Sequence, residues 1–273
     1  MPELPEVETI KRDLESKVKK RLIKSINIFE GSERLFIKKD INFFSTALIG
    51  NKIDCLSRHG KYLIFSISNK KYLIVHLRMT GSISINPSNS PMAPYEKIRF
   101  NFDNNFSMSL MDIRKFATID IYSNLVNFNQ RIGPDSISHD FNPAFLKSKL
   151  VARKSSIKSA LLDQSIAAGV GNIYADEACW DAGINPLQKA FLLNDDEINR
   201  LCASIKNVLF ESINNRGTTI NNYKDLLGNS GYHQTKVAVY GRVDKKCLRC
   251  SQKIIKTRVV GRSTFYCSKC QEL

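Results

Sequence analysis

Four cysteines near the C-terminus restrict the fold of that segment more than any other feature of the chain. They follow the pattern C-x2-C-x16-C-x2-C and are Cys247, Cys250, Cys267 and Cys270. Each C-x2-C pair can sit on a tight turn and present two sulfurs to one tetrahedral ion, so in a reducing compartment the spacing predicts a zinc site rather than disulfides. Four thiolate ligands leave no open position, and the one zinc ion would therefore be structural. The other three cysteines are predicted to be small buried side chains: Cys55, Cys179 and Cys202.

Hydrophobic periodicity predicts a helix and then a run of strands in the N-terminal half. Apolar residues from Val7 to Val18 recur at helical spacing, which predicts a helix over roughly residues 6–20. Over residues 52–122 the period changes to two, and short strand-like runs alternate with turn signals. This pattern is typical of a β-sandwich or a flattened barrel, along which the helix would lie.

We therefore expect an α+β protein of two domains and a zinc segment, since 273 residues suffice for two cores. The strand period ends at the polar stretch 131–143, and residues 143–182 and 195–214 are predicted to be helical. The expected parts are a β-sandwich domain (1–131), a linker (132–142), a helical domain (143–236) and a zinc segment (237–273). The helical domain would end in a polar loop at 217–236, and KTRVV and STFYC would form a hairpin in the zinc segment.

The charge of the chain favours a polyanionic partner. It has 41 basic and 26 acidic residues, a net charge of +15. Residues 236–273 alone contain ten Lys or Arg and two acids, a net +8. Such an excess attracts polyanions, of which nucleic acid is the commonest. No apolar run approaches the ~18 residues that span a bilayer, and there is no signal peptide, so we expect a cytoplasmic protein without a membrane partner.

The first nine residues, MPELPEVET, combine two prolines with three acids. A helix could begin near Val7 with the preceding Pro-Glu pair in its first turn, where a missing N–H and a carboxylate are both tolerated. This leaves Pro2 unexplained. Bacterial processing commonly removes Met1 before a small residue, and the mature chain would then begin with a secondary amine, with Glu3 and Glu6 close behind.

Two segments in the C-terminal half have the features of phosphate-binding sites. GVGNIYADE (169–177) places Asn172 as the N-cap of a helical run, and the free N–H groups of an exposed helix N-terminus suit a phosphate. An earlier helix, at about 157–163, would complete a helix–two-turn–helix arrangement. RSTFYC (262–267) puts Arg262 at the tip of the zinc hairpin, where its fork of donors can bind phosphate. The alternatives are that Asn172 only caps its helix and that Arg262 is only solvated.

Three further motifs lie where strands are predicted to end. RHGKYL contains Lys61 and VHLRMTG contains His76, both of which could be ordinary surface residues. The Arg-Met-Thr-Gly turn has Met79 at its tip, and DIRKF flanks a lysine with Arg114 and Phe116. An apolar side chain beside arginine on a basic face can wedge between base pairs. From spacing alone, packing in the core is the favoured alternative for Met79 and Phe116.

Together these motifs resemble one known family. MPELPEVET, RHGKYL, HLRMTG, DIRKF, GVGNIYADE, VYGR and RSTFYC with the four cysteines occur in this order over nearly the whole chain. The chain is similar to the bacterial formamidopyrimidine-DNA glycosylases, the 8-oxoguanine repair enzymes of the helix–two-turn–helix superfamily. The resemblance implies an N-terminal β-sandwich with a long first helix, a helix–two-turn–helix domain and a zinc-finger hairpin.

The resemblance also implies roles for individual residues. The implied catalytic residues are Pro2 as nucleophile, Glu3 and Glu6 as carboxylates, and Lys61; the implied proton donors are Glu3, Lys61 and Arg262. The residues implied to contact DNA are His76, Met79, Arg114, Phe116, Lys154, Asn172, Tyr240 and Arg262. Of these, Met79, Arg114 and Phe116 would fill the hole left by the extruded base, and Arg114 would read the orphaned cytosine. Lys154 would lie near the lesion. The implied phosphate contacts are Lys61, His76, Asn172, Tyr240 and Arg262. The loop 217–236 would close over the damaged base.

The chain departs from the usual family pattern near the wedge. Ile113 replaces a proline and Ala117 a glycine, which could alter the stiffness of this loop and so the preference for the opposite base. Thr80 occupies a position that is often serine in the family, which is a minor change.

The implied function is that of a bifunctional DNA glycosylase and AP lyase. The Pro2 amine would attack C1′ of a flipped nucleotide, release an oxidised purine and form a Schiff base that cuts the strand by β- and then δ-elimination. The implied partner is double-stranded DNA containing oxidised purines, bound by a monomer associated with the nucleoid. Two alternatives stay open. One is an endonuclease VIII-like enzyme for oxidised pyrimidines, which Leu4 disfavours because that enzyme usually has glycine there. The other is a zinc-ribbon protein that recognises lesions without cutting.

Overall fold

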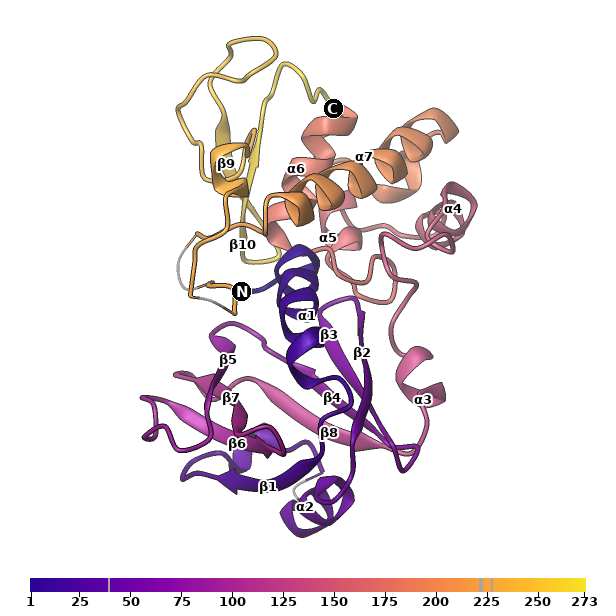
Figure 1. Cartoon of the computed structure of the whole chain (residues 1–273). Coiled ribbons are helices and arrows are strands. Elements are labelled where there is room, and N and C mark those ends of the chain that lie inside the picture. The colour runs from indigo at the N-terminus through magenta and orange to yellow at the C-terminus, as the bar shows by residue number, and fades with distance from the viewer. Residues whose placement is uncertain (39, 221–222, 227) are drawn as a thin grey trace. The chain divides into compact units, whose positions relative to one another are not determined.

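The chain forms two compact units (Figure 1) in a computed structural model that describes residues 1–38, 40–220, 223–226 and 228–273. The N-terminal unit comprises Met1–Phe128 and Arg216–Gly231, and the C-terminal unit comprises Asn129–Asn215 and Tyr232–Leu273. Most of the loop predicted at 217–236 thus makes its contacts within the N-terminal unit, whereas the sequence grouped it with the helical domain. Positions 221, 222 and 227 of this loop lie outside the described residues.

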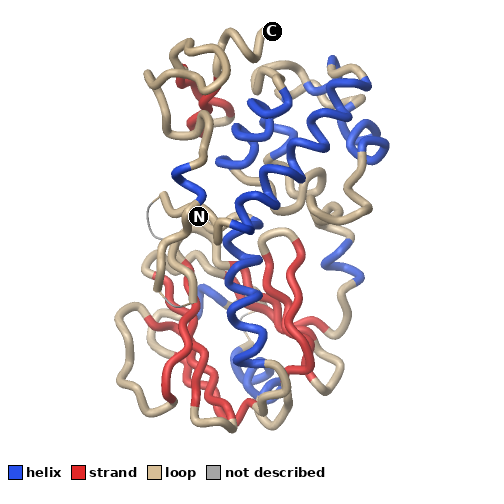
Figure 2. Tube along the Cα trace, turned by 45° about the horizontal axis from the view of Figure 1, so that its top comes forward, coloured by secondary structure: helices blue, strands red, loops and turns tan. Residues whose placement is uncertain are grey.

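Two four-stranded antiparallel sheets build the N-terminal unit (Figures 1 and 2). The strand order of the first sheet is β1 (Ile23–Ile28), β6 (Glu96–Phe102), β7 (Phe106–Asp112) and β5 (Gly81–Pro87). The strand order of the second sheet is β2 (Ile53–His59), β3 (Tyr62–Ile67), β4 (Tyr72–His76) and β8 (Thr118–Tyr122). Apolar side chains of both sheets, such as Phe65 and Phe100, meet in one buried core. The predicted β-sandwich is therefore confirmed.

Helix α1 (Leu4–Val18) packs on this core with Ile10, Leu14 and Val18. It begins before the predicted start near Val7, because Glu3 is its N-cap and the Glu6 carboxylate accepts a hydrogen bond from the Glu3 N–H. This is one half of a capping box, which satisfies backbone donors that a helix start leaves without intrahelical partners.

Several elements between residues 23 and 48, and near 126, were absent from the prediction. They are β1, the short helix η1 (Glu33–Leu35), α2 (Ile41–Leu48) and α3 (Val126–Asn129). Strand β1 is mostly exposed or half-buried along its length, so it lacks the continuous apolar signal of the later strands. Helix α2 starts at a side-chain cap, in which Asp40 accepts from the Phe43 N–H at 2.8 Å.

Four helices and a β-hairpin form the C-terminal unit. They are α4 (Pro143–Leu150), α5 (Ile157–Leu161), α6 (Asn172–Ala182), α7 (Asp195–Asn214), β9 (Ile255–Val259) and β10 (Arg262–Tyr266), with short turns η2 (Ala190–Leu192) and η3 (His233–Thr235). The helical stretch predicted over 143–182 is thus three helices, and α5 and α6 are the pair expected of a helix–two-turn–helix. Among the described residues, no helix combines the length and the apolar composition needed to cross a membrane.

Two adjacent acids on α6 attach the zinc segment to the helices. The Asp176 carboxylate accepts from the Phe265 N–H of β10 at 2.9 Å and pairs with the fully buried Lys158 ammonium of α5 at 2.8 Å. Burial raises the pKa of Asp176 to about 7, and the Lys158 charge acts in the opposite direction. The Glu177 carboxylate accepts the three consecutive N–H groups of residues 238–240 at 2.7–2.9 Å. One turn of α6 therefore holds both the start of the zinc segment and strand β10.

Replacing Asp176 by Asn should destabilise the C-terminal unit, because the Lys158 ammonium would be buried without its carboxylate. We expect D176N to lower the free energy of unfolding in urea by about 3–5 kcal/mol, the usual cost of removing one partner from a buried ion pair. The matched control is Asp195→Asn, which removes an exposed pair with Lys147 and should cost at most about 1 kcal/mol. Equally small losses for both variants would contradict the assignment.

Candidate active site and nucleic-acid contacts

Pro2, Glu3 and Glu6 are all buried at the start of α1. The two Glu6 carboxylate oxygens accept one backbone N–H each, from Glu3 at 2.7 Å and from Thr218 at 2.7 Å. Glu6 therefore joins the first residues of the chain to the segment 216–231. Gly217 makes this approach possible: its φ is +83°, and a Cβ there would lie 2.9 Å from the Glu6 carboxylate.

A narrow pocket lies beside Pro2. Its wall includes Met79 from the turn after β4, and Tyr223 and Lys224 from the segment 216–231. Tyr223 is largely buried, and burial, with the nearby Glu6 carboxylate, raises the pKa of its phenol. Residues of the segment 216–231 therefore form part of the wall of the pocket beside Pro2.

Lys61 and His76 lie where the sequence placed them, at ends of neighbouring strands. Lys61 is in the tight turn between β2 and β3, and His76 is the last residue of β4. Both side chains are buried, so neither is an ordinary surface residue. The His76 Nδ1 accepts from the Arg78 N–H at 2.9 Å, which leaves the proton of the neutral ring on Nε2. Burial, together with the charges of Arg78 and Lys61, lowers the pKa of His76 to about 3.

The tips of two neighbouring turns carry Met79, Arg114 and Phe116. Met79 and Phe116 are 45% and 48% exposed, so the alternative that both pack in the core is wrong. The Arg114 guanidinium lies 4.7 Å from the Phe116 ring centroid and 3.5 Å from the Met79 sulfur. Buried Asp112 shapes this turn, because its carboxylate accepts the backbone N–H groups of residues 114, 116 and 117.

In the C-terminal unit, the structure brings Asn172 and Tyr240 together beside β10. The predicted N-cap role of Asn172 is wrong: Gly171 is the N-cap of α6, and Asn172 is already helical. Its side chain instead donates to the Tyr240 hydroxyl at 3.3 Å and to the Ser263 carbonyl at 3.1 Å.

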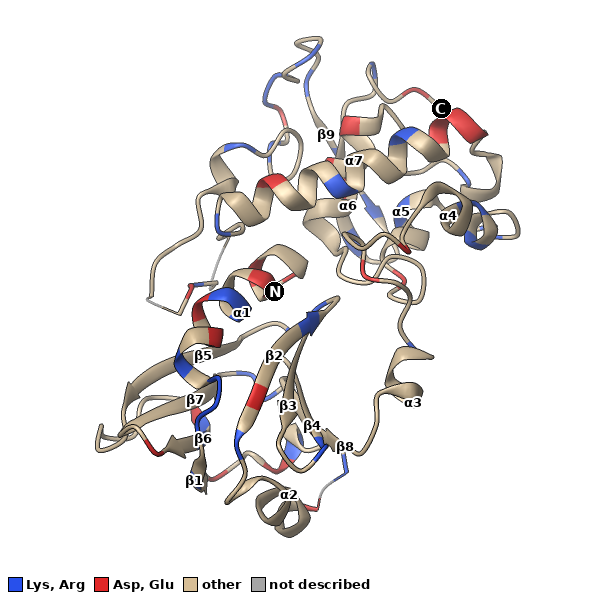
Figure 3. Ribbon diagram, turned by 45° about the vertical axis from the view of Figure 1, so that its right-hand side comes forward, with Lys and Arg blue, Asp and Glu red and all other residues tan. Residues whose placement is uncertain are grey.

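The two remaining cations of the predicted set are exposed. Arg262 begins β10, directly after the hairpin turn at Val260 and Gly261. Lys154 lies in the connection before α5. Lys and Arg also recur along the segment around β9 (Figure 3), as the local charge count led us to expect.

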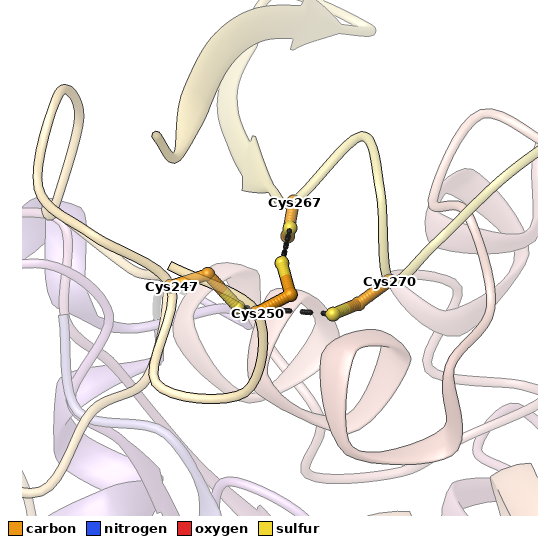
Figure 4. Close-up of side chains that lie close together, drawn as sticks. All are labelled: Cys247, Cys250, Cys267 and Cys270. Carbon is orange, nitrogen blue, oxygen red and sulfur yellow. Dashed lines mark hydrogen bonds between the residues drawn. The ribbon is translucent and has the colours of Figure 1, made fainter. Parts of the chain in front are cut away.

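The four cysteines of the C-terminal motif converge on one point (Figure 4). Their sulfurs lie within 4.8 Å of one another, with Cys247–Cys270 at 3.9 Å and Cys250–Cys267 at 3.4 Å. Four zinc–thiolate bonds of ~2.3 Å in a tetrahedron place sulfurs roughly 3.8 Å apart, so this donor set fits one zinc ion. The Trp180 indole N–H donates to the Cys247 sulfur at 3.4 Å.

Sequence families match all three parts of the chain. Residues 1–119 match the formamidopyrimidine-DNA glycosylase N-terminal domain, residues 132–224 the formamidopyrimidine-DNA glycosylase H2TH domain, and residues 244–273 the zinc finger found in FPG and IleRS. A formamidopyrimidine-DNA glycosylase of Carboxydothermus hydrogenoformans is 38% identical over 272 residues and covers 100% of both chains.

The chain belongs to the formamidopyrimidine-DNA glycosylase family.

Solved structures of a second relative agree with this family assignment. A point mutant of the Lactococcus lactis FPG, in complex with a Fapy-dG containing DNA, has a TM-score of 0.92 and 35% identity and covers 100% of both chains. The Lactococcus lactis Fpg in complex with an abasic site containing DNA has a TM-score of 0.91 and 35% identity, and the match covers 99% of this chain and 100% of that chain. The same protein in complex with an oxidised pyrimidine containing DNA has a TM-score of 0.91 and 34% identity, and the match covers 100% of both chains. The α+β fold and the structural zinc site expected from the sequence are therefore confirmed.

Sequence reasoning missed four residues that position this site of the glycosylase family. Asp112, Asp176 and Glu177 stand inside the quoted motifs DIRKF and GVGNIYADE, yet they were passed over because their partners are backbone N–H groups and, for Asp176, also the Lys158 ammonium. The role of Asp112 could have been predicted from the sequence, because an aspartate in a turn often accepts a hydrogen bond from the backbone N–H two residues further on. The role of Trp180 could not, because its partner Cys247 is 67 residues away. One expectation about the cysteines was also wrong: Cys55 is exposed, whereas Cys179 and Cys202 are buried.

Zinc removal should be visible in the fluorescence of Trp180, the only tryptophan of the chain. We expect one zinc per chain, released by a mercurial and counted with a chromogenic chelator, and a change in tryptophan emission at the same rate. Cys270→Ser should lower the zinc content, while the control Cys55→Ser should leave it unchanged because Cys55 is not in the cluster. Full zinc content in C270S would refute the four-cysteine site.

Burial of neutral His76 should make the N-terminal unit sensitive to acid. The pKa of His76 in the folded chain lies below its ordinary value of 6.5, so the unfolded chain takes up the proton first as the pH falls. The stability that neutral His76 contributes is therefore lost as the pH falls from 6.5 towards 3. Between pH 6.5 and 5 the wild type should lose up to about 2 kcal/mol more than His76→Gln in urea denaturation. Identical pH profiles for the two chains would show that folding does not lower the pKa of His76.

Proposed function

We propose that this protein is a bifunctional DNA glycosylase and AP lyase that acts as a monomer on double-stranded DNA containing oxidised purines. The observation that carries the proposal is the buried group Pro2, Glu3 and Glu6 at the start of α1, in a chain that matches this family over its whole length. A relative crystallised with Fapy-dG containing DNA supports an oxidised purine as substrate.

The proposed nucleophile is the α-amine of Pro2. While Met1 is attached, the Pro2 nitrogen is an amide without a reactive lone pair, so Met1 must first be removed. An α-amino group has a pKa of ~7.7–8.0, and a useful share is therefore neutral near pH 7.5. Attack on C1′ displaces the damaged base, which leaves with a proton, and the ring opening of the sugar gives an iminium between Pro2 and C1′.

The iminium then acts as an electron sink for strand cleavage. Because a secondary amine forms it, the positive charge is permanent, and loss of the C2′ proton expels the 3′ phosphate by β-elimination. A second proton loss expels the 5′ phosphate by δ-elimination, and hydrolysis returns the free amine. The four-thiolate zinc site has no open position, so the metal would hold the hairpin and supply no catalytic step.

Glu3 and Glu6 receive different roles. Glu3 is adjacent to the amine and suits proton transfer to and from the opened sugar, together with Lys61 and Arg262 as further proton donors. Glu6 lies in the first turn of α1. Its oxygens accept the N–H groups of Glu3 and Thr218, which favours a positioning role.

Exposed apolar side chains support the proposed wedge. Met79 and Phe116 lie beside the Arg114 guanidinium on two turns fixed by Asp112. Insertion of such side chains offsets the few kcal/mol that base extrusion costs. Arg114 would then donate to the orphaned cytosine.

The proposed phosphate contacts come from both units. They are Lys61, His76, Asn172, Tyr240 and Arg262, with Lys154 near the lesion. His76 would donate through Nε2–H, since Nδ1 already accepts from Arg78. The hydrogen bond from Asn172 orients the Tyr240 hydroxyl, and the Ser263 carbonyl holds Asn172 next to Arg262.

Borohydride trapping tests this proposal. Mature protein, shown by mass spectrometry to lack Met1, is mixed with a duplex holding 8-oxoguanine opposite cytosine, reduced and digested. We expect the cross-link on Pro2, because reduction converts the iminium to a stable amine. The matched control is the same chain with Met1 retained, which should bind DNA but neither cross-link nor incise.

Other outcomes identify the alternatives. Incision by the chain that retains Met1, or a cross-link at another residue, would refute the Pro2 assignment. Faster incision of thymine glycol than of 8-oxoguanine would favour the oxidised-pyrimidine enzyme. Incision rates are compared, and not binding alone, because a relative also crystallises with oxidised-pyrimidine DNA. Tight lesion binding without any incision would indicate the non-catalytic alternative.

A further inference from the structure

Arg216 joins the segment 216–231 to helix α1, a role that its position at the end of α7 does not suggest. One guanidinium nitrogen pairs with the carboxylate of Asp13, and the same nitrogen pairs with Asp225 at 2.7 Å. The Arg216 Nε also donates to Asp225, at 3.1 Å. Asp225 is 2% exposed, Asp13 18% and the Arg216 side chain 37%, so the two carboxylates are largely shielded from solvent while the guanidinium is partly open to it.

The backbone of Arg216 is in a conformation that favours glycine. Its φ is +59°, in the left-handed region, where a side chain with a Cβ is strained. A strained residue persists only where its surroundings hold it. Here the two carboxylates hold the guanidinium, and the Tyr223 hydroxyl donates to the Arg216 carbonyl at 3.2 Å.

The contacts of the segment with α1 fall on one face of that helix. Glu6 accepts the Thr218 N–H, and Asp13 accepts from Arg216. Residues 6 and 13 are seven apart, which is two helical turns, and therefore share a face. Ile10, between them, lines the pocket beside Pro2 with Tyr223. The ion pair with Asp13 thus fixes the far end of a contact that begins at Glu6.

The other end of the segment is also tied to Asp225. The second Asp225 oxygen accepts the Asn229 N–H at 2.8 Å, and the backbone of Asp225 donates to the Asn229 carbonyl at 2.9 Å. Gly231 packs on Gly217 so closely that a Cβ on Gly231 would lie 2.1 Å from the Gly217 carbonyl oxygen. Arg216 therefore links the start of the segment, its inner turn and helix α1.

A base attached to C1′ must lie within a few ångströms of Pro2 when the amine attacks. The pocket there is walled by Tyr223 and Lys224 of this segment. A damaged base would meet that wall, whereas an abasic site has nothing to place against it. The position of the segment should therefore matter for base removal and not for cleavage of an abasic site.

We propose that Arg216 is a positioning residue that, through Asp13 and Asp225, holds the described residues of the segment 216–231 in the arrangement that accepts a lesion still carrying its base. The inference rests on the proposed function. It adds a residue of this chain that acts through Asp13 and Asp225 and that distinguishes two substrates of the same site.

Three variants test the proposal: Asp13→Asn, Arg216→Gly and the double variant. D13N leaves the Arg216–Asp225 pair in place and removes only the link to α1, and R216G also relieves the backbone strain, so neither is expected to unfold the unit. The matched controls are Lys20→Gly and Asp54→Asn. Lys20 has a φ of +63° and pairs with Asp54 at 2.9 Å in the same unit, outside the segment.

Two measurements are made on each variant. Hydrogen exchange at the Thr218 amide should become about tenfold faster in D13N and in R216G, because the segment loses its ion pair to α1 in both. Exchange at the Asn229 amide should become faster in R216G alone, because only there does its acceptor Asp225 lose the guanidinium. Single-turnover incision of 8-oxoguanine duplexes should fall about tenfold or more, since small misplacements near a reacting group cost this much, while incision of abasic duplexes stays within about twofold. The double variant should match R216G alone, as expected when both changes remove one interaction.

Each other result overturns the proposal. Unchanged exchange would show that the ion pair does not hold the segment, and equal losses on both substrates would show a general structural role. The same effects in K20G and D54N would show that any ion pair of this unit suffices. If the wild type incises neither substrate, the proposed function fails, and the exchange measurement still decides whether Arg216 holds the segment.

Discussion

The Glu6 carboxylate is the interaction on which the arrangement around Pro2 depends. It accepts the Glu3 N–H, which fixes where α1 begins, and the Thr218 N–H, which fixes where the segment 216–231 lies. A carboxylate that is 1% exposed is stabilised only if such donors replace its water. One residue thereby couples the local geometry of the first residues to a segment more than 200 positions away in the chain.

Buried acids that accept backbone N–H groups recur in both units. Asp112 closes the turn that carries Arg114, Glu177 holds the start of the zinc segment, and Asp176 holds strand β10. In each case the acid lies one step behind the side chains proposed to contact DNA. The exposed residues can then be apolar or cationic, because the turns that present them are held from within.

The sequence was sufficient for features whose signal is local. The zinc cysteines follow from spacing, the sandwich follows from the period of two over 52–122, and the helix predicted over 195–214 is α7. It was insufficient where the deciding partner is distant. The start of α1 depends on a hydrogen bond from the Glu3 N–H to Glu6, and the side chain of Asn172 bonds to Tyr240 rather than to its own helix. The exposure of Met79 and Phe116 also could not be read from spacing, because apolar residues at strand ends are usually buried.

The neutral form of His76 has a consequence for how DNA binding would respond to ionic strength. Each cation that contacts a phosphate releases a condensed counterion, and the logarithm of the binding constant falls with the logarithm of salt concentration by about 0.9 per such contact. Of the five proposed phosphate contacts, His76, Asn172 and Tyr240 are uncharged donors, and only Lys61 and Arg262 are cations. Three of the five contacts to the flipped nucleotide would therefore be hydrogen bonds that release no counterion, and only the two cations would make this clamp sensitive to salt. The strong salt dependence expected of a protein with a net charge of +15 would come from the wider basic surface instead.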